Sequence, residues 1–514
     1  MKIFQKEKTI EIFENEYWYG GVVRHGVNMP LTKDIEYFYE AGETIEGDSY
    51  SGFFVSNAGR FFDVSGDCRI QIKDGAFKVE YDRELRLESG YSDLKGAYYA
   101  AAKYFKKDEI KVPRDLLFYP QFCTWTEMGV DVSEEKILAY AQTIVDKKFP
   151  HGALLIDDGW MAEYGDWSFD ERKFKNPKAM IKKLKSLGFK VMLWLVPFVS
   201  DSADSYKILE QENGLIKTAD GTVLKRKWWN GKAAILDLTN PFVFKWLKDK
   251  LDALMTKYGI DGFKFDGGGA RFYQDDYVTY ASADSIGQSQ AWSELAMLYE
   301  YSELKECVGY SGRHAIVRLN DKRRNWDRTE GLGALVPDMI QAGLCGYLYT
   351  CADMIGGGQI SDFWPGKTFN DNEVIKRYCE CSALMPCMQY SHGYWKKDRA
   401  VEKEFVRFAM LHVEYNEYLE ALIDEAEKNN TPIVRSLEFE FPHQGFEREM
   451  DVFMLGSSYL VAPVIVKNQE TKKLVLPKGY QWEYVPTGEI YGGGSQVEVS
   501  APIGVLPYFK KINA

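Results

Sequence analysis

Residues 259–266 read Gly-Ile-Asp-Gly-Phe-Lys-Phe-Asp, and three more glycines follow at 267–269. The apolar positions before Asp266 predict a short buried strand that ends in this carboxylate, with the glycines leaving space around it. A second run, Ala-Ile-Val-Arg-Leu-Asn-Asp at 315–321, also ends in a carboxylate, Asp321. A retaining glycosidase needs two carboxyl groups at strand ends, because one attacks a sugar carbon and the other transfers the leaving-group proton. The sequence therefore predicts a sugar-cleaving enzyme.

Outward from these strands, residues 114–415 alternate between short apolar runs and amphipathic helical patterns. Strands are predicted at 117–125, 153–156, 189–199 and 235–239, and further strands end at Asp266, Asp321 and Asp353. Helices are predicted at 133–147, 177–187 and 241–258. This alternation indicates a parallel sheet covered by helices. Seven or eight such units in about 300 residues favour a closed (β/α)8 TIM barrel over an open doubly wound sheet.

The barrel region is flanked on both sides by strand-rich sequence. Alternating patterns at 69–73 and 77–81 predict an N-terminal β-sandwich over residues 1–113, closed by a helix at 94–105. Strand patterns at 459–466, 473–477 and 479–494 predict a small C-terminal β-sandwich domain over residues 416–514. The fold class expected is thus α/β, with a TIM barrel between two β domains.

The composition of the chain limits the classes of partner and of bound group that we expect. The net charge of −12 argues against nucleic acid or an anionic membrane as a partner. We expect no transmembrane helix, no signal peptide and a cytoplasmic location, since no long apolar run is present and the first residues are charged. The eight cysteines lack paired-ligand spacing and the six histidines are scattered, so we expect free buried thiols, no metal site and no cofactor.

Carboxylates recur at the predicted strand ends. Those facing the same end of a barrel would be Asp157, Asp158, Asp266, Asp321 and Asp353. Any one of them could instead be a helix N-cap, but the whole set is harder to explain in that way. Lys264 and Arg318 precede two of the aspartates by two or three residues and can point at the same site. We expect Lys264 to keep Asp266 ionised, and crowding by other carboxylates to raise the pKa of Asp321.

Taken in order, several motifs resemble glycoside hydrolase family 31 over residues 114–400. They are Leu-Ile-Asp-Asp-Gly-Trp at 155–160, Gly-Asp-Trp-Ser-Phe-Asp at 165–170, Gly-Phe-Lys-Val-Met-Leu-Trp-Leu-Val-Pro-Phe at 188–198, the strand that ends at Asp266, and Asp-Met-Ile-Gly-Gly at 353–357. The resemblance implies a retaining exo-α-glycosidase whose partner is a small oligosaccharide or glycoside.

The resemblance also assigns roles to individual residues. Asp266 matches the nucleophile, and Asp321 matches the acid/base because it stands five residues before Trp326, as in the family. The segment after Arg318 is short, so Asp327 remains a rival for the acid/base. The substrate-binding residues implied are Asp157, Asp158, Trp194, Lys264, Arg318, Asp353 and His392.

The chain departs from the α-glucosidase pattern of that family, since glycines follow the nucleophile. These departures are similar to the myogenesis-regulating glycosidase branch. Residues 156–160 also resemble the galactose-binding strand of family 36 α-galactosidases, in which adjacent aspartates hold the 4- and 6-hydroxyls. An α-galactoside is therefore the expected substrate. The alternatives are an α-glucosidase, a transglycosidase, a catalytically silent sugar-binding protein, or a metal-dependent barrel hydrolase.

Overall fold

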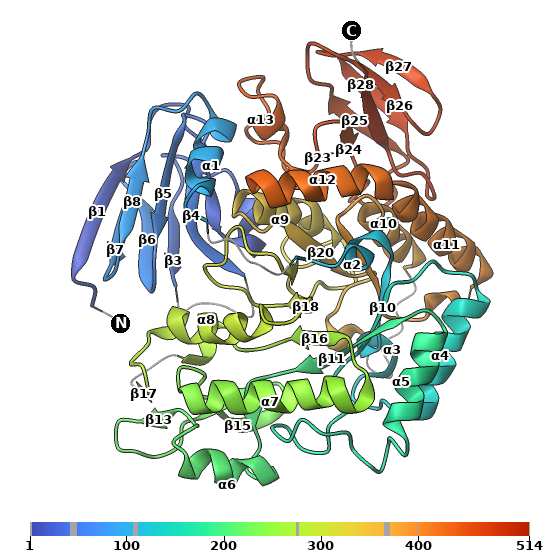
Figure 1. The fold of residues 1–514 in the computed structure, drawn as a ribbon. Helices are drawn as coiled ribbons and strands as arrows, with labels where there is room; N and C mark the ends of the chain where they lie inside the picture. Colours follow the sequence, from blue (N-terminus) through green and yellow to red (C-terminus); the bar gives the residue numbers. More distant parts are fainter. Residues whose placement is uncertain are drawn as a thin grey trace.

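The structure, a computed structural model, describes residues 3–41, 49–105, 111–273, 277–363, 371–396 and 398–512. Three parts follow one another along the chain: a pair of antiparallel sheets, a closed parallel barrel with its helices, and a second pair of antiparallel sheets. In Figure 1 the N-terminal sheets lie to the left of the barrel and the C-terminal sheets lie above it on the right. The predicted fold class is confirmed.

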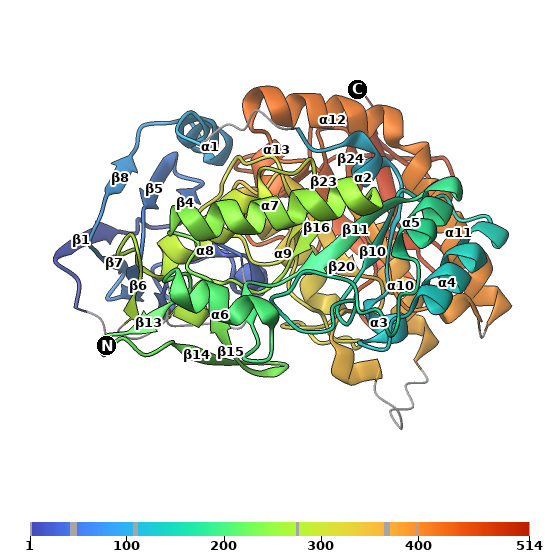
Figure 2. The same cartoon turned by 60° about the horizontal axis from the view of Figure 1, so that its bottom comes forward.

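The central barrel is closed by eight parallel strands, and hydrogen bonds join the last strand, β21, to the first, β9. The strands are β9 (Gln121–Cys123), β10 (Ala153–Ile156), β11 (Lys190–Leu195), β16 (Gly262–Phe265), β18 (Tyr301–Leu304), β19 (Ile316–Arg318), β20 (Tyr349–Met354) and β21 (Cys387–Tyr390). Figure 2 shows helices packed around the outside of this barrel. Because all eight strands are parallel, their carboxyl ends meet at one face.

The described helices around the barrel are α2 (Arg114–Phe118), α3 (Trp125–Met128), α4 (Glu134–Asp146), α5 (Pro177–Ser186), α6 (Asp204–Gln211), α7 (Pro241–Tyr258), α8 (Ser285–Ala296), α9 (Leu332–Leu344) and α10 (Asn372–Ser382). Five of these described helices, α4, α5, α7, α8 and α10, begin after a residue whose side chain caps their first turn. The Asn240 side chain caps α7 ahead of Pro241, and Gly259 ends it in the left-handed conformation. The helices predicted at 133–147, 177–187 and 241–258 are confirmed as α4, α5 and α7.

One predicted barrel strand was wrong, and one barrel strand was missed. The run at 235–239 is not a barrel strand, because β15 (Gly231–Ile235) pairs antiparallel with β12 (Phe198–Val199) and β14 (Lys225–Trp228) in a separate sheet. The barrel strand β18 was not predicted, because Tyr-Ser-Glu-Leu lacks a continuous apolar pattern. Its Glu303 is buried against charged partners inside the barrel, which no apolar pattern could indicate.

The N-terminal part is the predicted sandwich. One sheet contains β1 (Lys6–Glu11), β7 (Ala76–Tyr81), β6 (Cys68–Lys73) and β3 (Tyr37–Glu40), and the other contains β2 (Trp18–Val22), β4 (Tyr50–Ser56), β5 (Arg60–Val64) and β8 (Leu85–Glu88). Helix α1 (Leu94–Ala102) follows them. The 3-10 helix η1 (Val23–Asn28) leaves the sandwich and packs on α9 so closely that a Cβ on Gly26 would lie 2.3 Å from the Pro337 backbone.

After the barrel, α11 (Arg399–Glu414) and α12 (Asn416–Asn429) lead to the C-terminal part. Its larger sheet contains β22 (Val434–Arg435), β23 (Phe453–Leu455), β24 (Tyr459–Val461), β29 (Tyr508–Ile512), β26 (Gln481–Tyr484) and β27 (Glu489–Gly492), and its smaller sheet pairs β25 (Thr471–Val475) with β28 (Gln496–Ser500). Buried Trp482 and Phe509 lie in its own core. The domain borders at 113 and 415 stay predictions.

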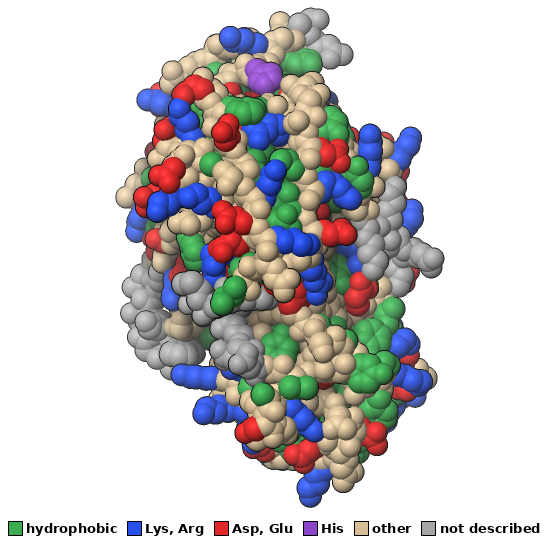
Figure 3. Space-filling view, turned by 90° about the vertical axis from the view of Figure 1, so that its left-hand side faces the viewer, with side chains coloured by type: hydrophobic (Ala, Val, Ile, Leu, Met, Phe, Trp, Pro, Cys, Tyr) green, Lys and Arg blue, Asp and Glu red, His purple; other side chains and the backbone are tan. Residues whose placement is uncertain are grey.

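All eight cysteines are buried and none forms a disulfide. Within the described ranges, no helix combines the length and the apolar character that crossing a membrane requires. On the face of the molecule seen in Figure 3, Lys and Arg side chains are interspersed with Asp and Glu.

Candidate active site

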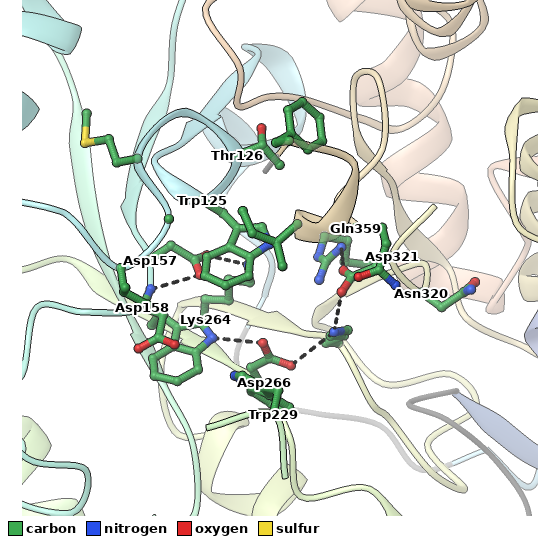
Figure 4. Close-up of a pocket in the computed structure, with 18 of the residues that line it drawn as sticks. Trp125, Thr126, Asp157, Asp158, Trp229, Lys264, Asp266, Asn320, Asp321 and Gln359 are labelled. Atoms are coloured by element: carbon green, nitrogen blue, oxygen red, sulfur yellow. Dashed lines mark hydrogen bonds and ion pairs between the residues drawn. The ribbon is translucent and has the colours of Figure 1, made fainter. Parts of the chain in front are cut away.

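A cavity of about 800 Å³ opens at the carboxyl ends of the barrel strands. Seven of the nine predicted site residues line it: Asp157, Asp158, Trp194, Lys264, Asp266, Arg318 and Asp321. Figure 4 shows Asp157 and Asp158 on one side of the cavity and Asp321 on the other, with Lys264 and Asp266 between them. Residues far apart in the sequence therefore meet in one place, as their shared position at strand ends predicted.

Asp266 directly follows β16 and is almost fully buried. Its Oδ2 accepts a 2.8 Å hydrogen bond from Nε1 of Trp194, and its Oδ1 accepts one of 2.8 Å from the backbone N–H of Gly267. Burial acts to raise the pKa of Asp266, but the positive charges of Lys305 and Lys264 outweigh it and lower that pKa. Asp266 is thus a fixed, ionised carboxylate, which is the state that a nucleophile needs.

Asp321 follows β19 and faces two cations. Its Oδ2 lies 2.9 Å from Nζ of Lys305, and its Oδ1 lies 3.0 Å from Nη1 of Arg318. The expectation that crowding would raise the pKa of Asp321 was wrong. Burial does act to raise this pKa, but Lys305 and Arg318 outweigh it and hold it well below its usual range. Asp321 is therefore a carboxylate, the form that acts as a base.

Lys305 also fixes the spacing of the two carboxylates, since its Nζ lies 3.6 Å from Oδ1 of Asp266. These oxygens of Asp266 and Asp321 can be no farther apart than 3.6 Å and 2.9 Å added together, which is 6.5 Å. A retaining displacement uses carboxyl groups about 5–5.5 Å apart and an inverting one about 6.5–9.5 Å. The upper limit for this pair therefore fits retention better than inversion.

Asp157 is held by buried partners on three neighbouring elements. Its Oδ2 lies 2.6 Å from Nζ of Lys264 and accepts a 3.1 Å hydrogen bond from the thiol of Cys123. Its Oδ1 accepts a 2.9 Å hydrogen bond from the backbone N–H of Asp158. Burial acts to lower the pKa of Lys264, but the charge of Asp157 outweighs it and raises that pKa, so the pair is ionic.

Among the described residues, no cation lies in hydrogen-bond contact with Asp158, which is held by neutral donors. Its Oδ1 accepts a 2.9 Å hydrogen bond from the Tyr164 hydroxyl, and its Oδ2 accepts one of 3.0 Å from Nδ2 of Asn230. Burial raises the pKa of Asp158 to about 6, although both donors act to lower it. The two adjacent aspartates thus lie in different surroundings, one paired with a cation and the other with neutral donors.

At the cavity wall, Arg318 connects the acidic residues. Its guanidinium contacts Asp353 through Nη1 and forms a 3.3 Å ion pair with Glu303 through Nε, in addition to its contact with Asp321. Asp353 in turn accepts 2.8 Å hydrogen bonds from the backbone N–H groups of Lys322 and Gly358. Asp353 therefore orients the arginine and the segment after Asp321.

Two predicted substrate-binding residues, Asp353 and His392, are not among the described residues that line the cavity. Asp353 is completely buried behind Arg318. The Nδ1 atom of His392 lies 3.1 Å from the Thr126 carbonyl oxygen, and its ring packs 5.2 Å from that of Phe363, so it supports the wall. Substrate contact by these two residues stays a prediction that the geometry does not favour.

Asp327, the rival acid/base candidate, is exposed and lies outside the described cavity lining. Its Oδ1 accepts hydrogen bonds of 2.7 Å and 2.9 Å from the backbone N–H groups of Thr329 and Glu330. Asp327 thus stabilises a turn, and of the two candidates only Asp321 lies beside Asp266 in the described cavity.

Sequence reasoning missed most of the other cavity residues, among them three that lie beside the predicted ones. Lys305 follows the unpredicted strand β18, and Trp229 and Asn230 form the tip of the β14–β15 hairpin. The only signal was the run Lys-Arg-Lys-Trp-Trp-Asn at 225–230, which reads as a solvated loop. Trp229 keeps 43% of its surface exposed and lies 6.4 Å from the Trp194 ring. In the part of the chain that the structure describes, no group of three or more His, Cys, Asp or Glu side chains could hold a metal ion.

Comparison with known proteins places these observations in a family. The profile of the glycosyl hydrolases family 31 TIM-barrel domain matches residues 118–424, and that of the family's C-terminal domain matches residues 430–514. The chain is 29% identical to the myogenesis-regulating glycosidase of Mus musculus, over 92% of this chain and 71% of that protein. It is 25% identical to alpha-glucosidase 2 of Bacillus thermoamyloliquefaciens, over 85% of this chain and 59% of that protein.

Solved structures share the fold. A family 31 α-xylosidase from a soil metagenome, complexed with xylose, matches with a TM-score of 0.85 and 19% identity, over 99% of this chain and 79% of that one. A family 31 sulfoquinovosidase from E. rectale, in complex with an aza-sugar inhibitor, matches with a TM-score of 0.85 and 18% identity, over 99% of this chain and 82% of that one. With both family 31 domain profiles matched across most of its length, the chain belongs to glycoside hydrolase family 31, a family of α-glycosidases.

Proposed function

We propose that this chain is a retaining exo-α-glycosidase that hydrolyses terminal α-galactosides by double displacement. The observation that carries the proposal is the placement of Asp266 and Asp321 in one cavity, with two of their oxygens no more than 6.5 Å apart. Family membership supports glycosidase chemistry, whereas the sugar, the stereochemical outcome and the role of each residue are part of the proposal.

In the first step Asp266 attacks the anomeric carbon, and the bond from that carbon to the leaving oxygen breaks. Asp321 donates its proton to the departing oxygen, and a covalent glycosyl-enzyme is formed on Asp266. The hydrogen bonds from Trp194 and Gly267 keep the Asp266 carboxylate in place for this attack. Before the attack, the positive charges of Lys305 and Lys264 stabilise the negative charge of the Asp266 carboxylate and keep this residue ionised.

In the second step Asp321, now a carboxylate, removes a proton from a water molecule. The resulting hydroxide attacks the anomeric carbon from the side that the leaving group vacated, and the bond to Asp266 breaks. Two inversions give net retention. The cations around Asp321 favour its ionised form, which suits this base role.

Asp157 and Asp158 support galactose as the sugar. They lie across the cavity from Asp321, where the hydroxyls far from the anomeric carbon would be. The axial 4-hydroxyl of galactose needs an acceptor in a different place from the equatorial one of glucose. Two adjacent carboxylates, one fixed by Lys264 and one by Tyr164 and Asn230, provide acceptors in two directions.

The matched proteins differ in their sugars, since they are named for glucosidase, xylosidase and sulfoquinovosidase activities. The test is therefore release of nitrophenol from matched α-galactoside, α-glucoside and α-xyloside, with the Asp266→Asn variant as control. We expect preference for the galactoside, and a loss in the variant on the order of 10⁴-fold or more at unchanged melting temperature.

Preference for the glucoside would keep the catalytic pair but refute the galactose assignment. Turnover that survives in Asp266→Asn would refute Asp266 as nucleophile. Proton NMR of the first-formed sugar distinguishes retention from inversion, and an added sugar acceptor reveals transglycosylation. Binding of the sugar without turnover of any glycoside would mean a silent sugar-binding protein.

A further inference from the structure

Lys305 is a cavity residue to which the double-displacement mechanism assigns no step beyond keeping the two carboxylates ionised. Its side chain extends from the segment after β18 and is 12% exposed. Its ammonium lies between the two carboxylates, 2.9 Å from Oδ2 of Asp321 and 3.6 Å from Oδ1 of Asp266. The three groups form a chain of alternating charge across the cavity.

The substrate needs part of the space that this ammonium occupies. The anomeric carbon must come within about 3–3.5 Å of an Asp266 oxygen, and the leaving oxygen must come within hydrogen-bond reach of Asp321. Both reacting atoms thus have to lie between the two carboxylates. A cation in contact with both of them stands where the glycosidic oxygen has to go.

The charges around Asp321 come from four elements. Lys305 follows β18, Arg318 ends β19, and Lys264 belongs to β16; all three are positive and face Asp321. The negative groups around them are Asp266 after β16, Glu306 after β18 and Asp353 at the end of β20. Burial acts to raise the pKa of Asp321, and among the cations Lys305 does most to lower it.

A second position at which the ammonium would be stabilised lies close by, at the ring of Trp229. The Trp229 ring is 5.8 Å from Nζ of Lys305, within the range at which an aromatic face attracts a cation. A lysine side chain has four rotatable carbon–carbon bonds, so a short movement toward this ring needs no change in the backbone. The movement would keep Lys305 in the cavity while opening the space between the carboxylates.

We propose that Lys305 is a positioning residue that holds Asp266 and Asp321 on either side of its ammonium before substrate binds. When the glycosidic oxygen enters, the ammonium leaves Asp321 and moves toward Trp229. Asp321 then takes up a proton from water, and this proton is the one it transfers to the leaving oxygen. The proposal rests on the proposed function, in which Asp321 is the acid/base.

The test compares the pH profiles of kcat/KM and of kcat for wild type, Lys305→Met and Lys305→Arg, on the nitrophenyl glycoside that wild type prefers. The profile of kcat/KM reports the free protein and that of kcat reports the complex. We expect Lys305→Met to move the basic limb of kcat/KM upward by roughly one to three pH units, since a nearby cation lowers a carboxyl pKa by about that much. The basic limb of kcat should stay in place, because Lys305 has already left Asp321 in the complex.

Lys305→Arg keeps the charge and should keep the wild-type limb of kcat/KM. If the basic limbs of both kcat/KM and kcat move in Lys305→Met, the ammonium stays beside Asp321 during turnover. If neither limb moves, the ammonium does not hold Asp321. Either result overturns the proposal. A purely structural role would lower the rates without moving a limb. If Lys305→Met does not fold, Lys305→Gln replaces it.

A measurement without turnover separates this proposal from the proposed function. Carboxyl carbon NMR of protein labelled at aspartate, with the Asp321 signal assigned through Asp321→Asn, follows its titration in wild type and in Lys305→Met. An unchanged titration refutes the role of Lys305 even in an active enzyme. Wild type that cleaves no glycoside refutes the proposed function, whatever the titration shows.

Discussion

The ammonium of Lys264 lies 2.6 Å from Oδ2 of Asp157, and both side chains are almost completely buried. Lys264 belongs to β16 and Asp157 follows β10, and only β11 separates these strands. Side chains from alternate strands meet in layers inside a barrel, which is why the two residues touch although they are far apart in sequence. The ion pair forms the floor of the cavity beside Asp266.

Replacing Lys264 alone should destabilise the protein strongly. Lys264→Met leaves the Asp157 carboxylate buried without its cation, a situation that typically costs about 3–5 kcal/mol. Removing both charges in Lys264→Met/Asp157→Asn should recover most of that loss but not the activity. Thermal unfolding of the two single variants and the double variant measures the coupling. If the losses of unfolding free energy in the two single variants simply add in the double variant, the two residues are not coupled.

Asp321 and Asp327 can be separated through the leaving group. Asp321→Asn should slow cleavage of a nitrophenyl glycoside on the order of 10²–10⁴-fold, because general acid catalysis is lost. It should slow the first step of a glycosyl fluoride much less, because fluoride departs without needing a full proton transfer. Azide should restore turnover and give a glycosyl azide of retained configuration.

The matched control for Asp321→Asn is Asp327→Asn, on the exposed turn six residues later. That variant loses only turn hydrogen bonds to Thr329 and Glu330, so its activity should stay close to that of wild type. The reverse pattern, with an active Asp321→Asn and an inactive Asp327→Asn, would transfer the acid/base role to Asp327.

Asp158 should make stability depend on pH with a defined sign. Its folded pKa of about 6 lies above the ordinary aspartate value of 3.8, so between these values the folded chain keeps a proton that the unfolded chain has lost. The contribution of Asp158 to stability therefore falls as pH rises from about 4 to about 6, by about 3 kcal/mol at most. Asp158→Asn should melt at a higher temperature than wild type at pH 7.5, with the difference closing at pH 4.

The same titration should appear in sugar binding. The ionised Asp158 has lone pairs left to accept a sugar hydroxyl, so KM for the preferred glycoside should rise as pH falls below about 6. Tyr164→Phe removes one donor to the Asp158 carboxylate and should move this inflection to higher pH. A KM inflection that survives in Asp158→Asn would belong to another group.

Asp353 should act on the rate rather than on binding. Asp353→Asn keeps a residue type that tolerates the positive φ of 69° found here, but it removes the charge that orients Arg318. We expect kcat to fall on the order of 10²-fold through misplacement of Asp321, with KM nearly unchanged. A rise in KM at constant kcat would instead show that Asp353 contacts the sugar.

The sequence was sufficient to predict the site wherever a residue's position follows from a strand end. Asp157 and Asp266 directly follow a strand and Asp321 stands three residues after β19, and the parallel arrangement brings such strand ends together. The depth of each residue could not be predicted in the same way. Asp353 also ends a strand, yet it lies behind Arg318, because a strand pattern gives the direction of a side chain and not what stands in front of it.

The sign of the Asp321 pKa shift could not be predicted either, because it depends on Lys305. That lysine follows β18, a strand that shows no continuous apolar pattern because Glu303 is buried there against Arg318. Counting only the carboxylates predicted repulsion, whereas the folded site places a cation on each side of Asp321. Trp229 and Asn230 were missed for another reason, since a hairpin outside the barrel brings them to the cavity.

Trp229 provides the last prediction, because a large aromatic side chain that stays 43% exposed beside a polar cavity has room to stack on a sugar ring. Trp229→Ala should raise KM roughly tenfold, which corresponds to about 1.4 kcal/mol of binding, with a smaller change in kcat. Trp229→Phe should recover most of that affinity, since the ring remains. Phe242→Ala is the control: this aromatic is 40% exposed at the start of α7 and is not among the described cavity residues, so its removal should leave KM unchanged. Equal KM values for Trp229→Ala and wild type would show that the hairpin only shields the cavity and that the sugar is held by the carboxylates alone.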